Sequence, residues 1–275
     1  MTIIDVGSGP PVVLVPGIQG RWEWMKPAVD ALAADCRVIT FSLADEPSCG
    51  GRFDEANGFA CYVDQVREAM DQAAVSKAVI AGVSYGGLIA AAFAARHPER
   101  VRALVLISAL PPSWTPNARA RFYLRAPRLL FPLFMINSLR MYREIAAATP
   151  GVRRGVSAAV RHALNVLTHR LSPSRMARRV HLLSSVQLSR DLRTVSAPTL
   201  VITGEPGLDL VVPVRLTEEY MRLYPQAERV TLPRTGHLGL ITRSREFAAA
   251  VVPFVDRNSE PGTRDAEPHR ERRIG

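Results

Sequence analysis

Lysine, cysteine and long apolar runs are all scarce in this 275-residue chain. Of its 35 basic residues, only Lys26 and Lys77 are lysines. It has no run of about 18 apolar residues, the length that a transmembrane helix requires. Its first residues lack the charged and apolar regions of a secretory signal. We therefore expect a cytoplasmic protein without stable membrane insertion.

The three cysteines indicate neither a disulfide framework nor a metal site. Cys36, Cys49 and Cys61 are odd in number, their spacing is unlike that of metal ligands, and no histidine lies close to them in the sequence. No cluster of His, Asp and Glu has ligand spacing either. We expect reduced thiols, no bound metal and no cofactor.

Acidic residues are almost missing from residues 112–190. This stretch has fourteen arginines, no lysine and a single acid, Glu144, so its formal charge is +13 while the rest of the chain sums to −3. Such a basic block can attract a membrane, a nucleic acid or an anionic substrate. Because arginine replaces lysine along the whole chain, we favour a solvated arginine-rich face, although an anion or membrane preference stays open. No nucleic-acid-reading element is recognisable, so we expect no nucleic-acid partner.

Short apolar runs alternate with longer stretches of helical spacing through most of the chain. The helical stretches are 23–34, 55–74, 86–96, 213–223 and 243–255. The apolar runs, typical of strands buried on both faces, are 12–17, 36–44, 78–84, 101–110, 199–205 and 228–233. This alternation predicts an α/β fold with a doubly wound, mostly parallel sheet.

Residues 112–190 interrupt the alternation. They contain no convincing strand and have the pattern of several helices separated by prolines, after which the sheet pattern resumes. We predict a core of residues 1–111 and 191–256, with 112–190 inserted as a helical cap over the carboxyl edge of the sheet, where open α/β sheets bind ligands. The polar residues 257–275 lack periodicity, and we predict that they are disordered.

A serine between glycines lies at the junction of a predicted strand and a predicted helix, in the sequence GVSYG at 82–86. The motif alone is weak, but strand, serine and small-residue helix together are what a nucleophile elbow requires. Such a turn strains the backbone at the serine, so its neighbours two residues away must be small. Gly82 and Gly86 meet this need, and we predict that Ser84 is a nucleophile.

A serine hydroxyl needs a base, and the base needs an acid. His237 follows the last predicted strand in a loop with Gly236 and Gly239, and it is our candidate base. Asp209 lies in the loop after the strand at 199–205 and is the favoured acid, while Glu205, closer to the strand end, is the competitor. The resulting order of serine, acid and histidine is the one that this elbow architecture uses.

Acyl transfer also needs two donors for the developing oxyanion. The backbone N–H of Tyr85 is one candidate, at the start of the helix after the serine. The other is the N–H of Ile18, in a loop that Gly17 and Gly20 allow to bend.

Together these residues resemble the α/β-hydrolase superfamily, over about residues 5–256. The motifs are GVSYGG, AARHPERVRALVLIS, DLVVP at 209–213 and TGH at 235–237. The greatest resemblance is to small microbial serine carboxylesterases with a helical cap, and it implies Ser84, Asp209 and His237 as the triad. The sequence departs from this pattern in having Pro16-Gly17 where relatives usually have His-Gly, a longer loop around Asp209 and a shortened amino-terminal hairpin.

The resemblance implies a serine esterase that acts on a small-molecule ester through an acyl-enzyme. The alternatives are a carbon–carbon bond hydrolase, an amidase, a cofactor-free peroxidase or a non-enzymatic ligand receptor on the same fold. The oligomeric state stays open.

The substrate preference rests on the inserted segment. We expect most of the apolar run 129–136 to bury against the carboxyl edge of the sheet, and the arginines to lie mainly on the outer face. Trp22, Trp24 and Trp114 are candidates for lining the same cavity. We therefore predict a preference for apolar esters of short to medium chain.

Overall fold

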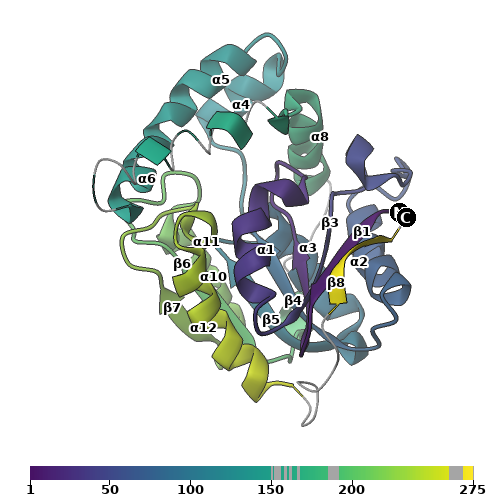
Figure 1. Cartoon of the computed structure of the whole chain (residues 1–275). Helices are drawn as coiled ribbons and strands as arrows, with labels where there is room; N and C mark the ends of the chain where they lie inside the picture. Colours follow the sequence, from purple (N-terminus) through teal and green to yellow (C-terminus); the bar gives the residue numbers. More distant parts are fainter. Residues whose placement is uncertain are drawn as a thin grey trace.

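The protein is described by a computed structural model over residues 1–149, 151, 156–157, 160, 163–165, 168–184, 192–259 and 269–274. Among these residues, eight strands form one sheet in the order β7-β6-β5-β4-β2-β3-β1-β8 (Figure 1). The strands are β1 (Ile3–Gly7), β2 (Pro11–Val15), β3 (Arg37–Phe41), β4 (Ala78–Val83), β5 (Val101–Ile107), β6 (Thr199–Thr203), β7 (Glu228–Thr231) and β8 (His269–Ile274).

The central part of the sheet is parallel. β2 pairs in parallel with β3 and β4, and the parallel pairing continues from β4 through β5 and β6 to β7. Among the described strands, antiparallel pairing occurs at β1, which pairs in this way with both β3 and β8. The predicted doubly wound, mostly parallel α/β fold is confirmed.

Two helical layers cover the sheet because successive side chains of a strand point to opposite faces. On β2, Val13 and Val15 pack with one apolar cluster, whereas Val12 and Leu14 pack with the other. The first cluster includes residues of α2 (Ala60–Gln72), α3 (Tyr85–Arg96) and α10 (Val214–Leu223). The second includes α1 (Lys26–Leu32), α11 (Gly239–Thr242) and α12 (Ser244–Arg257). Burial on both faces explains the continuous apolar runs.

Every regular element among the described residues of 112–190, hereafter the insertion, is a helix. These are α4 (Ala118–Arg125), α5 (Phe131–Ser138), η4 (Leu139–Met141), α6 (Tyr142–Ala148) and α8 (Pro173–Ser184). They lie between β5 and β6 in the chain and above one end of the sheet in space (Figure 1). Several short helices thus stand where the sequence predicted an inserted helical segment.

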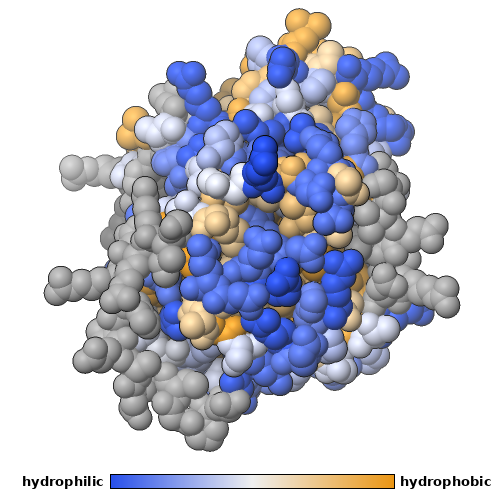
Figure 2. Space-filling view, turned by 90° about the vertical axis from the view of Figure 1, so that its right-hand side faces the viewer, coloured by the Kyte–Doolittle hydropathy of each residue, from blue (hydrophilic) through white to orange (hydrophobic). Residues whose placement is uncertain are grey.

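The expectation that most of the apolar run 129–136 is buried is wrong. Leu129 is 80% exposed and Ile136 is 64% exposed, and no side chain of the run reaches full burial. Figure 2 shows apolar side chains at the top of the molecule, at the height where Figure 1 places the insertion. The reason is geometric, because α5 is apolar on all sides but turns only one side towards the protein.

The predicted disordered tail also needs a partial correction. Residues 269–274 form β8, which pairs antiparallel with β1 and brings Arg272 opposite Asp5 in the register. An edge strand offers unpaired main-chain N–H and C=O groups, so a polar segment without apolar periodicity can still pair with it. Within the described part of the chain, no helix combines the length and the apolar character needed to cross a membrane.

Candidate active site

Ser84 lies at a sharp turn between the buried strand β4 and the helix α3. Its backbone has φ 53° and ψ −114°, in the region that residues with a side chain rarely adopt. The turn is held because the Ser84 N–H donates to Ile107 O at 2.8 Å, while Ser84 O accepts from the N–H groups of Gly87 and Leu110. Neighbouring strands therefore stabilise the strained conformation that the sequence predicted.

The glycines of the motif are required by close backbone contacts. A Cβ atom on Gly82 would lie 2.2 Å from Gly86 O, and one on Gly86 would lie 2.4 Å from Pro16 O. Real Cβ atoms do not approach other atoms so closely, so any larger residue would displace the turn. The two glycines thus fix the position of Ser84 against the loop after β2.

His237 and Asp209 are brought together by the loops that follow β7 and β6. The distance from His237 Nδ1 to Asp209 Oδ2 is 3.4 Å, and both side chains are buried. Asp209 Oδ1 accepts from the N–H groups of Val211 and Val212, at 3.1 and 2.8 Å. These bonds fix the carboxylate, so that it faces one ring nitrogen and leaves the other for a reaction partner.

The two groups shift each other's pKa. Burial raises the pKa of Asp209, but the His237 charge and the hydrogen bonds from His237, Val212 and Val211 outweigh it and leave this pKa below its usual value. Burial lowers the pKa of His237, but the Asp209 carboxylate outweighs burial, so the pKa of the imidazole is raised. A charged imidazole is thereby stabilised beside Asp209, as proton transfer from a nucleophile requires.

Glu205, the competing acid, has a different partner. Its Oε1 accepts from the backbone N–H of Arg234 at 2.7 Å, and its own N–H donates to Thr235 O. The side chain therefore supports the turn before His237, and it is Asp209 that contacts the imidazole.

The loop 17–20 lies directly against the serine. A Cβ atom on Gly17 would be 3.6 Å from Ser84 Cβ, and Gly20 N–H donates to Gly17 O to close the turn. The carbonyl oxygen of Ile18 accepts a hydrogen bond from Arg179 Nη1 at 2.6 Å. Tyr85 packs its ring edge-on against Phe59 and Tyr62, which anchors the start of α3. Both candidate donor residues thus sit in tightly held backbone next to Ser84.

Residues 12–250 match the profile of the family described as "Alpha/beta hydrolase family". The chain belongs to this family. The match includes Ser84, Asp209 and His237 together with the whole insertion.

Proteins similar to this α/β hydrolase are named as hydrolytic enzymes, which supports a hydrolase activity for the chain. The pimeloyl-acyl-carrier-protein methyl ester esterase of Vibrio atlanticus is 27% identical over 263 residues, covering 91% of this chain and 96% of that protein. A Rhizobium rhizogenes protein proposed to be a carbamate hydrolase, RutD, is 23% identical and covers 94% of this chain and 97% of its own length. The enol-lactonase of Burkholderia xenovorans has the same fold, with a TM-score of 0.74, 20% identity and coverage of 93% and 96%.

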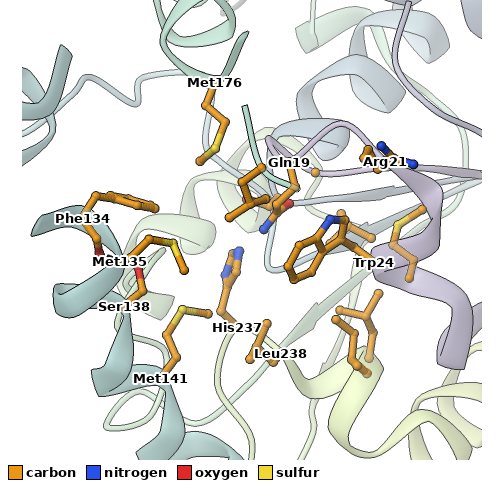
Figure 3. A pocket seen from close by; sticks show the side chains of 17 residues that line it. Gln19, Arg21, Trp24, Phe134, Met135, Ser138, Met141, Met176, His237 and Leu238 are labelled. Atoms are coloured by element: carbon orange, nitrogen blue, oxygen red, sulfur yellow. Dashed lines mark hydrogen bonds between the residues drawn. The ribbon is translucent and has the colours of Figure 1, made fainter. Parts of the chain in front are cut away.

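A cavity of about 110 Å³ in this α/β hydrolase opens onto Ser84 and His237. The insertion contributes one wall, with Phe134 and Met135 from α5 beside Met176 from α8 (Figure 3). Gln19 and Arg21 from the loop after β2 supply polar groups opposite. The cavity therefore combines a few polar groups with a largely apolar wall.

The three tryptophans have different places. Trp24 lines the cavity. Trp22 packs in the apolar cluster around α1, and Trp114 packs against the cluster around α3, so neither is among the residues that line it. One of the three candidate binding residues is thus brought to the site.

Two charged residues of the insertion were not foreseen as part of the site. Arg179 is fully buried, although the arginines were expected mainly on the outer face, and its guanidinium binds Asp45, Glu46 and Ile18 O. Glu144 is also buried and contacts the loop of His237. Glu144 carried a signal in the sequence, as the single acid among fourteen arginines. Arg179 carried none, because nothing in its local pattern separates it from its arginine neighbours.

Proposed function

We propose that this α/β hydrolase is a serine esterase for apolar carboxylic esters of short to medium chain. Ser84 attacks the ester carbonyl while His237 takes its proton, and Asp209 stabilises the imidazolium. The backbone N–H groups of Tyr85 and Ile18 stabilise the tetrahedral oxyanion. His237 then protonates the leaving alcohol, and water repeats the sequence on the acyl-enzyme.

The observation that carries the proposal is the shared cavity of Ser84 and His237 with its apolar walls. An acyl or alcohol group placed there contacts Trp24, Phe134 and methionine side chains, which favour apolar and flexible groups. The insertion acts as a cap that shields the reaction from water. The Vibrio relative, itself an ester hydrolase by name, supports the same reaction class.

The test combines a substrate panel with the nucleophile variant. Purified protein is assayed against p-nitrophenyl esters of increasing chain length, a matched carbamate, a matched amide and a β-diketone. We expect ester turnover to exceed the other activities, and Ser84→Ala to lower kcat/KM by about 10⁴-fold or more while the fold stays intact. The exposed Ser76 serves as the matched control, because Ser76→Ala should retain full activity.

Other outcomes lead to other assignments. Faster cleavage of the β-diketone, the amide or the carbamate would replace the ester assignment with that reaction. Absence of both turnover and labelling by a fluorophosphonate would favour a ligand receptor. A well-folded Ser84→Ala protein with most of the wild-type rate would remove Ser84 as the nucleophile.

A further inference from the structure

Glu144 on α6 is a buried carboxylate that reaches from the insertion to the histidine loop. One oxygen, Oε1, accepts from the N–H of Gly236 at 2.7 Å and from the N–H of Leu238 at 2.6 Å. These two donors are the residues on either side of His237. The glutamate is 3% exposed, so both bonds are shielded from water.

The two bonds bend the backbone of residues 236–238 around a single oxygen atom. Hydrogen bonds to an ionised acceptor are roughly twice as strong as neutral ones, so both bonds are strongest at a pH above the pKa of Glu144. The Leu238 N–H belongs to the peptide unit that follows His237, and the Gly236 N–H belongs to the peptide unit that precedes Gly236, so the two bonds hold the backbone on both sides of His237. The imidazole itself contacts Asp209, with 3.4 Å between His237 Nδ1 and Asp209 Oδ2. The insertion thus binds the backbone around His237, and the core binds its imidazole ring.

We propose that Glu144 is a positioning residue for His237, which makes the placement and charge of the catalytic base depend on the docked insertion. The proposal rests on the proposed function, since it gives His237 the role of base. Glu144 is outside the cavity lining and acts through the loop and through its charge. With the insertion docked, the imidazolium formed in the reaction contacts the Asp209 carboxylate and is stabilised by the charge of Glu144.

The electrostatics agree with this arrangement. The titratable groups that influence Glu144 are His237 and Asp209, from the two loops packed against it. The pKa of Glu144 is raised to about 7: burial and the charge of Asp209 raise it, and the N–H donors of Gly236 and Leu238 and the charge of His237 offset part of this. In return, the Glu144 carboxylate adds to Asp209 in raising the pKa of His237.

Two variants separate position from charge. Glu144→Gln keeps an oxygen acceptor for both N–H groups and removes the charge, whereas Glu144→Ala removes both. We expect Glu144→Ala to lower kcat on the order of 10²-fold with a smaller change in KM, a loss typical of a misplaced general base. Glu144→Gln should recover most of this kcat. Glu99→Gln, at an exposed carboxylate near β5, is the control and should match the wild type.

The dependence of kcat/KM on pH provides a second test, because it would not change if Glu144 had a purely structural role. The acidic limb of kcat/KM reports the pKa of the free base. Since the carboxylate raises the pKa of His237, Glu144→Gln should move this limb to lower pH. An unshifted limb, or wild-type kcat in Glu144→Ala, would overturn the proposal. A Glu144→Gln protein that fails to fold would assign Glu144 to folding alone and overturn it as well.

A titration of the His237 ring by NMR separates this proposal from the proposed function. The signal is assigned by its loss in His237→Gln, and no substrate is needed. If no ester is turned over but the ring pKa falls in Glu144→Gln, the coupling stands and the esterase assignment fails. If esters are turned over and the ring pKa is the same in both proteins, the coupling fails and the esterase assignment stands.

Discussion

The sheet core and the insertion contribute to the site in different ways. The core supplies Ser84, Asp209 and His237, each in a turn or loop that follows a strand. Main-chain groups of the core hold Ser84 and Asp209, whereas the main chain beside His237 donates to Glu144 of the insertion. The insertion supplies apolar walls and two buried charges: Glu144 binds the loop that carries His237, and Arg179 binds Ile18 O in the loop beside Ser84. In the proposed mechanism, the reactive groups therefore come from one region and part of their alignment comes from the other.

The two regions also differ in how completely they are packed. Every residue of β4 is buried. In the insertion, Leu129 and Ile136 are mostly exposed, and α4 and α5 contain no fully buried residue. The buried apolar residues among the described part of the insertion lie in α6 and α8, the helices that also make the polar contacts of Glu144 and Arg179 to the core; they are Ile145, Ala148, Ala177 and Val180.

After Ser84→Ala, the largest effect expected in the core is that of replacing its acid. Asp209→Asn should lower kcat by about 10³–10⁴-fold, because the amide can favour the wrong imidazole tautomer. Glu205→Gln is the matched control, since Glu205 binds the Arg234 N–H instead of the imidazole, and its effect should be small. Steady-state kinetics on a p-nitrophenyl ester measures both. A larger loss in Glu205→Gln would exchange the roles of the two acids.

An intermediate effect is expected where the insertion is anchored. Arg179→Met leaves Asp45 buried without this cation and leaves Glu46 with the longer pair to Arg175, at 3.6 Å. Breaking a buried pair in this way costs about 3–5 kcal/mol. Denaturant unfolding measures the loss of free energy, and kcat should fall as well because Ile18 O loses its donor. Arg178→Met, on the same helix but partly exposed, is the control. Equal stability of the two variants would contradict an anchoring role for Arg179.

The smallest effect concerns the solvated arginines. If they lie away from the cavity, raising the salt concentration should change kcat/KM for a neutral ester by less than about twofold. An anionic ester of equal chain length provides the comparison. A strong, salt-sensitive preference for the anionic ester would place arginines at the entrance and contradict the apolar substrate preference.

Local patterns predicted the sheet and the elbow because their determinants are local. A strand buried on both faces is apolar throughout, and the turn at Ser84 needs glycines two residues away. Each feature is therefore determined by a few residues that are neighbours in the sequence. The choice between Asp209 and Glu205 was harder. It depends on how a loop folds back, and only the contact of Asp209 with His237 separates the two carboxylates.

Long-range contacts explain what the sequence did not predict. Arg179 lies more than 130 positions from Asp45 in the chain, and its burial follows from the docking of α8. β8 forms because β1 has a free edge, which the polar composition of the tail does not reveal. Trp22 and Trp114 are apolar and close to the site in sequence, but packing turns them towards the two clusters.

Arg179 has a consequence for protein engineering and for the evolution of new specificity. One way to change the substrate range is to replace the insertion with that of a related protein, with the chain exchanged near residues 112 and 190. A replacement segment without an arginine at the position of Arg179 would leave Asp45 and Glu46 buried without the guanidinium that binds them. It would also remove the guanidinium against which Gly20 fits. A successful chimera should therefore exchange residues 17–20 and 45–46 together with the insertion, as one inherited unit.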